Sequence, residues 1–73
     1  MSKTTSETLK SLGKKVQKLR REQDLTQEDL AHELGISRVY MGYIEQGRES
    51  PSLKLLMKMA RKFGVGVEDL FHR

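Results

Sequence analysis

The 73-residue sequence predicts an all-α domain of five short helices. Apolar residues recur at intervals of three and four along most of the chain, which is the period of an amphipathic helix. Serine and threonine residues suited to helix starts alternate with glycines suited to helix ends. No segment alternates apolar and polar residues in the way a half-buried strand would. These three observations favour helices throughout.

The first helix is expected to run from Thr8 to Gln23. Four apolar residues at helical spacing mark its inner face: Leu9, Leu12, Val16 and Leu19. Residues 1–8 are expected to form a flexible N-terminal segment, and residues 9–73 the folded domain. Gly13 lies inside this helix, at a cost of about 1 kcal/mol relative to alanine. Asp24 stands where the chain turns, a position that favours glycine because glycine tolerates a left-handed backbone.

Two short helices separated by one tight turn are expected next. Thr26 is a suitable N-cap for the second helix, with Asp29 three residues later as in a capping box, and Gly35 ends that helix. Ser37 caps the third helix and Gly47 ends it. The inner positions of the pair are apolar or small: Leu30, Ala31, Leu34, Met41 and Ile44. A small residue, a turn glycine and an apolar inner face are what a steep crossing of two short helices requires, so the window 27–46 predicts a helix-turn-helix motif.

The last two helices follow the loop that contains Pro51. Ser52 caps the fourth helix and Gly64 ends it. Its apolar residues at helical spacing are expected in the core: Leu53, Leu56, Met57, Ala60 and Phe63. A short fifth helix is expected from Val67, with Leu70 and Phe71 as its apolar residues.

The net charge of +4 is distributed unevenly. Residues 1–24 carry seven basic and three acidic groups, residues 25–47 one and four, and residues 48–73 six and three. A mild positive balance is compatible with nucleic acid or an anionic membrane as a partner, and also with an ordinary solubility charge. No apolar run approaches the roughly 20 residues of a membrane span, and no signal peptide is visible. A cytoplasmic protein without a membrane partner is therefore expected.

An enzyme or a metalloprotein is not expected. The chain has no cysteine, which excludes disulfides and thiolate metal sites. The stretch "HELGI" at 32–36 lacks the second histidine of a zinc-binding HExxH helix, because position 36 is Ile36. Glu68 and His72 are four residues apart, but two ligands do not make a metal site. We therefore expect no metal, no cofactor and no small-molecule ligand.

Residues 12–71 resemble the Cro/C1-type (XRE-like) helix-turn-helix domains of phage and bacterial transcriptional regulators. Six stretches carry the resemblance: "LR" at 19–20, "LTQEDLA" at 25–31, "LGIS" at 34–37, "YIEQG" at 43–47, "SPSL" at 50–53 and "GVGVEDLF" at 64–71. Asp24 departs from the usual glycine of the family, and Gly66 from its usual capping serine. The resemblance implies a five-helix repressor-type fold and a small phage repressor, Cro-like or restriction-modification controller-like protein. It also implies a bacterial or phage-encoded protein associated with the nucleoid.

The resemblance implies that the third helix, residues 38–46, lies in the major groove of double-stranded DNA with its first turn deepest. Base contacts are expected from Ser37, Arg38, Val39, Gly42 and Tyr43. Arg38 can bind guanine bidentately, and Val39 can touch a thymine methyl group. Phosphate contacts are expected from Gln27, Tyr40, Gln46, Arg48, Ser50, Ser52 and Lys54. Arg38 as a solvated arginine, and Tyr43 as an exposed aromatic without a role, remain the alternatives.

Three further expectations complete the interpretation. In the family, the arginine at Arg20 and the glutamate at Glu45 form an ion pair that ties the first helix to the third. A homodimer on a two-fold-related operator is expected, because one recognition helix contacts few bases. Its interface is expected at the apolar C-terminal end: Val65, Val67, Leu70 and Phe71. The alternative for Val67 and Leu70 is that they complete the monomer core.

The alternative function is of a different class. A protein-interaction module, antitoxin-like or dependent on a partner protein, would retain the helix-turn-helix fold without binding DNA. Such a module would tolerate the loss of Arg38 and would show no salt-dependent binding to DNA.

Overall fold

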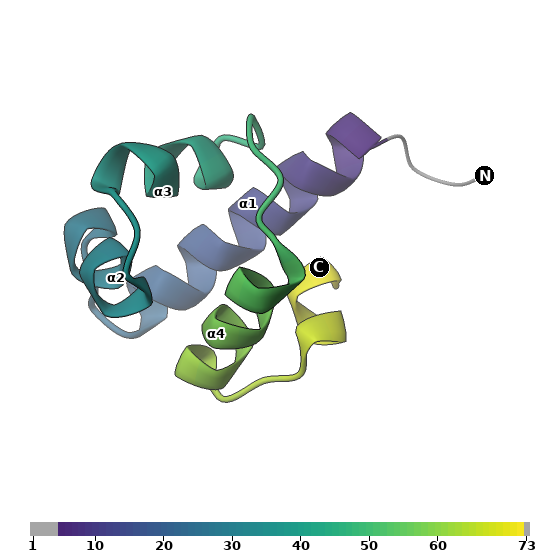
Figure 1. Ribbon diagram of the computed structural model, residues 1–73. Helices are drawn as coiled ribbons and strands as arrows, with labels where there is room; N and C mark the ends of the chain where they lie inside the picture. Colours follow the sequence, from purple (N-terminus) through teal and green to yellow (C-terminus); the bar gives the residue numbers. More distant parts are fainter. Residues whose placement is uncertain (1–4, 73) are drawn as a thin grey trace.

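The structure, a computed structural model, describes residues 5–72. This part of the chain is all-helical, with four α-helices and one closing 3-10 helix. In chain order they are α1 (Thr5–Glu22), α2 (Gln27–Leu34), α3 (Arg38–Glu45), α4 (Leu53–Phe63) and η1 (Val67–Phe71). The long α1 crosses the molecule, and both α3 and η1 pack against it (Figure 1). No helix within residues 5–72 is long and apolar enough to span a membrane.

The two ends of the fold differ from the sequence-based expectation. The first helix begins at Thr5, three residues before the expected start, and residues 1–4 lie outside the described residues. The short fifth helix expected from Val67 is a 3-10 helix and not a fifth α-helix. Its Asp69 amide donates to the Gly66 carbonyl three residues earlier, which is the 3-10 spacing. Gly66 has no side-chain oxygen to cap the first turn, so only the Asp69 carboxylate, which accepts from the Gly66 amide, secures this start.

The starts of α2, α3 and α4 are capped as expected. Thr26 Oγ1 accepts from the Asp29 amide, and the Asp29 carboxylate accepts from the Thr26 amide, which completes a capping box. That bond from the Thr26 amide, with a smaller contribution from the Thr26 side chain, holds the pKa of the Asp29 carboxyl below its ordinary value. Ser37 caps α3 and Ser52 caps α4 in the same way through their hydroxyl oxygens. Side chains therefore satisfy amides that each helix start would otherwise leave unpaired.

One core lies between the helices. Its fully buried large side chains come from all five elements: Leu12, Val16, Leu30, Met41, Ile44, Met59 and Leu70. The expectation for Leu53 and Met57 was wrong, because these side chains are 65% and 49% exposed. Apolar residues occupy more than half of the circumference of α4, so spacing alone does not decide which face is covered. Leu55, Leu56 and Met59 are buried instead, and α4 packs against α2 and η1.

Candidate nucleic-acid interface

The turn between α2 and α3 consists of residues 35–37. Gly35 adopts a left-handed backbone with a φ of 72°, and its amide closes α2 by donating to carbonyls of the last turn. Ala31, on the inner side of α2, is 2% exposed, and α2 packs closely on α3. The small side chain and the glycine turn together allow two short helices to meet and change direction within three residues.

The first turn of α3 presents its side chains to solvent. Ser37, Arg38 and Val39 are exposed, and Val39 retains 55% of its accessible surface although it is apolar. The Ser37 hydroxyl oxygen already accepts from the Tyr40 amide, which leaves its proton and one lone pair for a ligand. The first turn therefore offers one arginine and one apolar side chain on a capped helix.

Gly42 does not lie on this exposed face, contrary to expectation. It is buried, and a Cβ atom built on it would lie 3.8 Å from Gln27 Oε1. Gly42 follows Arg38 by one helical turn, but at this level α3 lies against the Gln27 side chain of α2, which covers the glycine. Tyr43, the next residue, is half-buried.

Arg20 and Glu45 form a buried ion pair between α1 and α3. Arg20 Nε donates to Glu45 Oε2 at 2.7 Å and Arg20 Nη2 donates to Glu45 Oε1 at 3.2 Å. The remaining guanidinium edge donates to the Leu25 carbonyl at 2.6 Å. Gln27 Nε2 also donates to Glu45 Oε1, at 3.0 Å. One carboxylate thus joins the end of α1, the start of α2 and the end of α3.

Gly13 allows α1 and α3 to come this close. A Cβ atom at this position would lie 2.4 Å from the Glu45 carbonyl oxygen and 2.6 Å from the Ile44 carbonyl oxygen. Both contacts are with backbone atoms, which cannot yield as a flexible side chain does. Sequence reasoning registered Gly13 only as a weak point of the helix. A glycine inside an otherwise strongly helical segment could have indicated that another backbone packs closely at this position.

The end of α3 forms a Schellman turn. Gly47, with a φ of 76°, donates its amide to the Ile44 carbonyl, and Arg48 donates its amide to the Tyr43 carbonyl at 2.9 Å. The Arg48 guanidinium carbon lies 4.6 Å from the centroid of the Tyr43 ring. This distance is within the range of a cation–π contact. The sequence reasoning did not foresee this pair.

The residues expected to contact phosphate lie mostly on the surface. The exposed ones are Gln46, Arg48, Ser50, Ser52 and Lys54. Gln27 and Tyr40 are half-buried: the amide of Gln27 is bonded to Glu45, and the ring of Tyr40 packs against the core. The fold therefore restrains the side chains of Gln27 and Tyr40 more than those of the five exposed residues.

A family model described as helix-turn-helix matches residues 16–70, from the second half of α1 to η1. The chain belongs to this helix-turn-helix family.

Individual relatives of this helix-turn-helix protein have named roles. It is 56% identical over 48 residues, 66% of the chain and 73% of the relative, to an uncharacterized HTH-type transcriptional regulator of Methanocaldococcus jannaschii. It is 38% identical to the control protein C.MunI of a Mycoplasma species over 60 residues, which are 81% of either chain. The crystal structure of the restriction-modification controller protein C.AhdI from Aeromonas hydrophila superposes with a TM-score of 0.80 at 33% identity. That alignment covers 86% of this chain and 96% of the controller protein.

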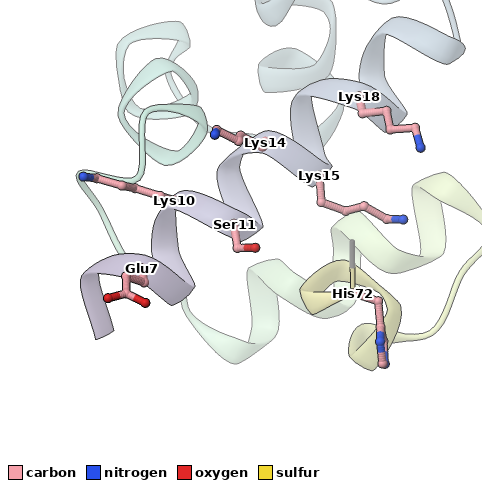
Figure 2. A pocket seen from close by; sticks show the side chains of 7 residues that line it. All are labelled: Glu7, Lys10, Ser11, Lys14, Lys15, Lys18 and His72. Carbon is pink, nitrogen blue, oxygen red and sulfur yellow. The ribbon is translucent and has the colours of Figure 1, made fainter. Parts of the chain in front are cut away.

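A basic hollow lies on α1 of the helix-turn-helix protein. It measures about 540 Å³ and is lined by Glu7, Lys10, Ser11, Lys14, Lys15, Lys18 and His72. Figure 2 shows the four lysines spaced along α1, with Lys10 and Lys14 extending to one side of the helix and Lys15 and Lys18 to the other, and His72 below. Residues 1–24 carry seven basic groups, whereas residues 25–47, which contain α2 and α3, have a net charge of −3. Much of the positive charge of the domain therefore lies on α1. Lys10, Lys14 and Lys18 are exposed and Lys15 is half-buried, so these lysines form a mainly solvated face.

The C-terminal end is less available for association than expected. Leu70 is 0% exposed and belongs to the monomer core. Val65 and Val67 are half-buried and pack against that core, which leaves Phe71 as the exposed member at 38%. The alternative that these residues complete the monomer core therefore holds for Leu70, because η1 closes the core over α1 and α4.

No group of three or more histidine, aspartate or glutamate side chains within residues 5–72 is arranged to hold a metal ion.

Proposed function

We propose that this chain is a sequence-specific double-stranded DNA-binding transcriptional regulator that acts in the cytoplasm. In the proposal, α2 and α3 form the helix-turn-helix motif of residues 27–46, and α3 lies in the major groove. The observation that carries it is the first turn of α3, where Arg38 and Val39 project to solvent from a helix tied to α1 by the Arg20–Glu45 pair. Membership of a family whose named members include transcriptional regulators supports the same conclusion and argues for binding rather than catalysis.

Base reading is assigned to the exposed side of α3. Arg38 has the planar fork of donors that matches guanine O6 and N7, and Val39 can pack on a thymine methyl group. The hydroxyl proton of Ser37 is a weaker candidate because its oxygen already caps the helix. Gly42 is left out of the proposed contacts, since it is buried against Gln27.

Phosphate binding is assigned to the residues around the helix pair. The N-terminus of α2, beside Gln27, offers free amides and the positive end of a helix dipole to an anion. Tyr40 lies on the first turn of α3, and Gln46, Arg48, Ser50, Ser52 and Lys54 follow from its end to the start of α4. Contacts of this kind set the register of a protein on DNA without reading its sequence.

The operator is proposed to be two-fold related, because two copies of a small domain read more bases than one. A homodimer would place its two recognition helices about 34 Å apart, one turn of DNA. Phe71 is the proposed centre of the contact, with the exposed edges of Val65 and Val67. Such an interface is isologous, with the same patch used by both subunits.

The test begins with selection of bound sequences from random duplex DNA, which also reports half-site symmetry. The variants Arg38→Ala and Arg48→Ala are then compared on the selected operator and on random duplex. We expect Arg38→Ala to weaken operator binding by roughly 1–3 kcal/mol, to leave random duplex nearly unchanged, and to relax preference at one guanine of each half-site. Arg48→Ala should weaken both kinds of DNA alike.

Two outcomes would change the assignment. Equal losses on both duplexes for Arg38→Ala would make Arg38 a backbone contact. No salt-dependent DNA binding by the parent chain, or no effect of Arg38→Ala on either duplex, would favour the protein-interaction module instead.

A further inference from the structure

The Schellman turn at the end of α3 fixes where Arg48 lies. In such turns the residue two positions beyond the helix cap commonly packs on a side chain of the last helical turn, and that contact is usually apolar. Here the two positions hold Arg48 and Tyr43, and their backbones are joined by the Arg48 amide to Tyr43 carbonyl bond at 2.9 Å. The contact between their side chains is therefore a guanidinium on an aromatic ring, at 4.6 Å from the ring centroid.

The turn itself is held by α1. Gly47 has a φ of 76°, which strains any residue with a side chain, and a Cβ atom there would lie 2.8 Å from Lys10 Cα. The backbone between Tyr43 and Arg48 is thus set by both conformation and packing. The position of Arg48 over the ring follows from this backbone as well as from the attraction between the two groups.

The stacked guanidinium keeps its donors available. A guanidinium that lies on an aromatic face uses its π surface, while its N–H groups point outward in its own plane. The Arg48 guanidinium makes one long hydrogen bond within residues 5–72, from Nη1 to Gln46 Oε1 at 3.5 Å. Arg48 is exposed and makes no ion pair with a described residue. A cation in a fixed place with free planar donors is suited to bidentate binding of a phosphate.

We infer that Tyr43 is a positioning residue for Arg48, and that the stacked pair binds one phosphate of the DNA backbone at the C-terminal end of α3. This inference rests on the proposed function and deepens it. It assigns Tyr43 to affinity through Arg48 instead of to base reading. The ring fixes the guanidinium before DNA arrives, so less side-chain freedom is lost on binding.

A double-mutant cycle tests the inference, with dissociation constants measured by fluorescence anisotropy at several salt concentrations. Tyr43→Leu should weaken operator and random duplex equally, by about two- to fivefold, the range for an exposed cation–π contact. Arg48→Ala should weaken both duplexes more and lower the salt slope by about one unit. In the Arg48→Ala background, Tyr43→Leu should have no further effect. Tyr43→Phe keeps the ring and should bind as the parent does.

Matched controls separate the inference from its rivals. Arg61→Ala removes an exposed arginine of α4 that makes no cation–π contact within residues 5–72, and it should not couple to Tyr43→Leu. Thermal melts of all variants show whether α3 remains folded. Equal losses from Tyr43→Leu with and without Arg48 would overturn the inference. So would a loss on the operator alone with Tyr43→Phe, because the hydroxyl would then read a base.

The proposed function has a separate criterion. If the parent chain binds its operator and Arg38→Ala relaxes specificity, the function stands, and the cycle alone decides the role of Tyr43. Absence of salt-dependent DNA binding by the parent chain would overturn both.

Discussion

Asp24 is the one non-glycine residue within residues 5–72 that adopts a left-handed backbone, with a φ of 57°. It ends the turn after α1, where its amide donates to the Arg21 carbonyl, and its side chain is exposed. Residues with a Cβ atom are strained in this conformation, although aspartate tolerates it better than most. The sequence indicated this position because a glycine would be preferred there.

We expect Asp24→Gly to stabilise the domain slightly, by less than about 1 kcal/mol. Glycine relieves the strain but also increases the conformational freedom of the unfolded chain, so the two effects partly cancel. Urea denaturation of the variant beside the parent measures the difference. A clear loss of stability would mean that the Asp24 carboxylate has a stabilising contact of its own.

At the scale of the helices, the junction of α1 with α3 depends on Gly13. Gly13→Ala would normally stabilise a helix by about 1 kcal/mol. Here we expect it to destabilise the domain by roughly 1–3 kcal/mol, because the new methyl group would overlap the carbonyl oxygens of Ile44 and Glu45. Thermal melts can compare it with Lys14→Ala, the adjacent exposed position of α1. A stabilised Gly13→Ala variant would show that α3 moves away from α1 without cost.

The same junction depends on the ion pair between Arg20 and Glu45. The side chains of Arg20 and Glu45 are 8% and 2% exposed, so removal of one leaves the other buried without its partner. Arg20→Ala and Glu45→Ala are each expected to cost roughly 3–5 kcal/mol, and the double variant less than the sum. A domain of this size has a total stability of only about 4–11 kcal/mol, so the measurements need low temperature. Losses that add without any coupling would contradict an interaction between the two residues.

The sequence predicted the starts of α2, α3 and α4 correctly, because each start depends on a few neighbouring residues. Thr26, Ser37 and Ser52 cap their helices as expected, because a cap is a contact between residues three apart. Burial on α4 was harder to predict, because apolar residues occupy more than half of its circumference and only the packing of the whole domain leaves Leu53 and Met57 exposed. The position of Gly42 likewise depends on the crossing of α2 with α3, which the spacing of apolar residues does not define.

At the scale of the whole molecule, the proposed dimer can be tested through Phe71. Phe71→Ser should shift sedimentation equilibrium towards monomer, and it should also lower the melting temperature, because this side chain is only 38% exposed and the rest of it is covered by the domain. Met57→Ser, at a 49% exposed position of α4, is the matched control. A dimer lost with Met57→Ser but kept with Phe71→Ser would move the interface to α4. A parent chain that stays monomeric at high concentration, with and without DNA, would exclude the dimer.

The buried carboxylate of Glu45 has a consequence for how specificity can change over time. It is held by Arg20 of α1 and Gln27 of α2, so the tilt of α3 is set by two helices together. Substitutions on the inner side of α1 can therefore change the orientation of the α3 side chains, although the substituted residues themselves contact no ligand. A lineage of such proteins has two routes to a new binding preference. One exchanges the exposed residues of α3, and the other alters the support beneath them.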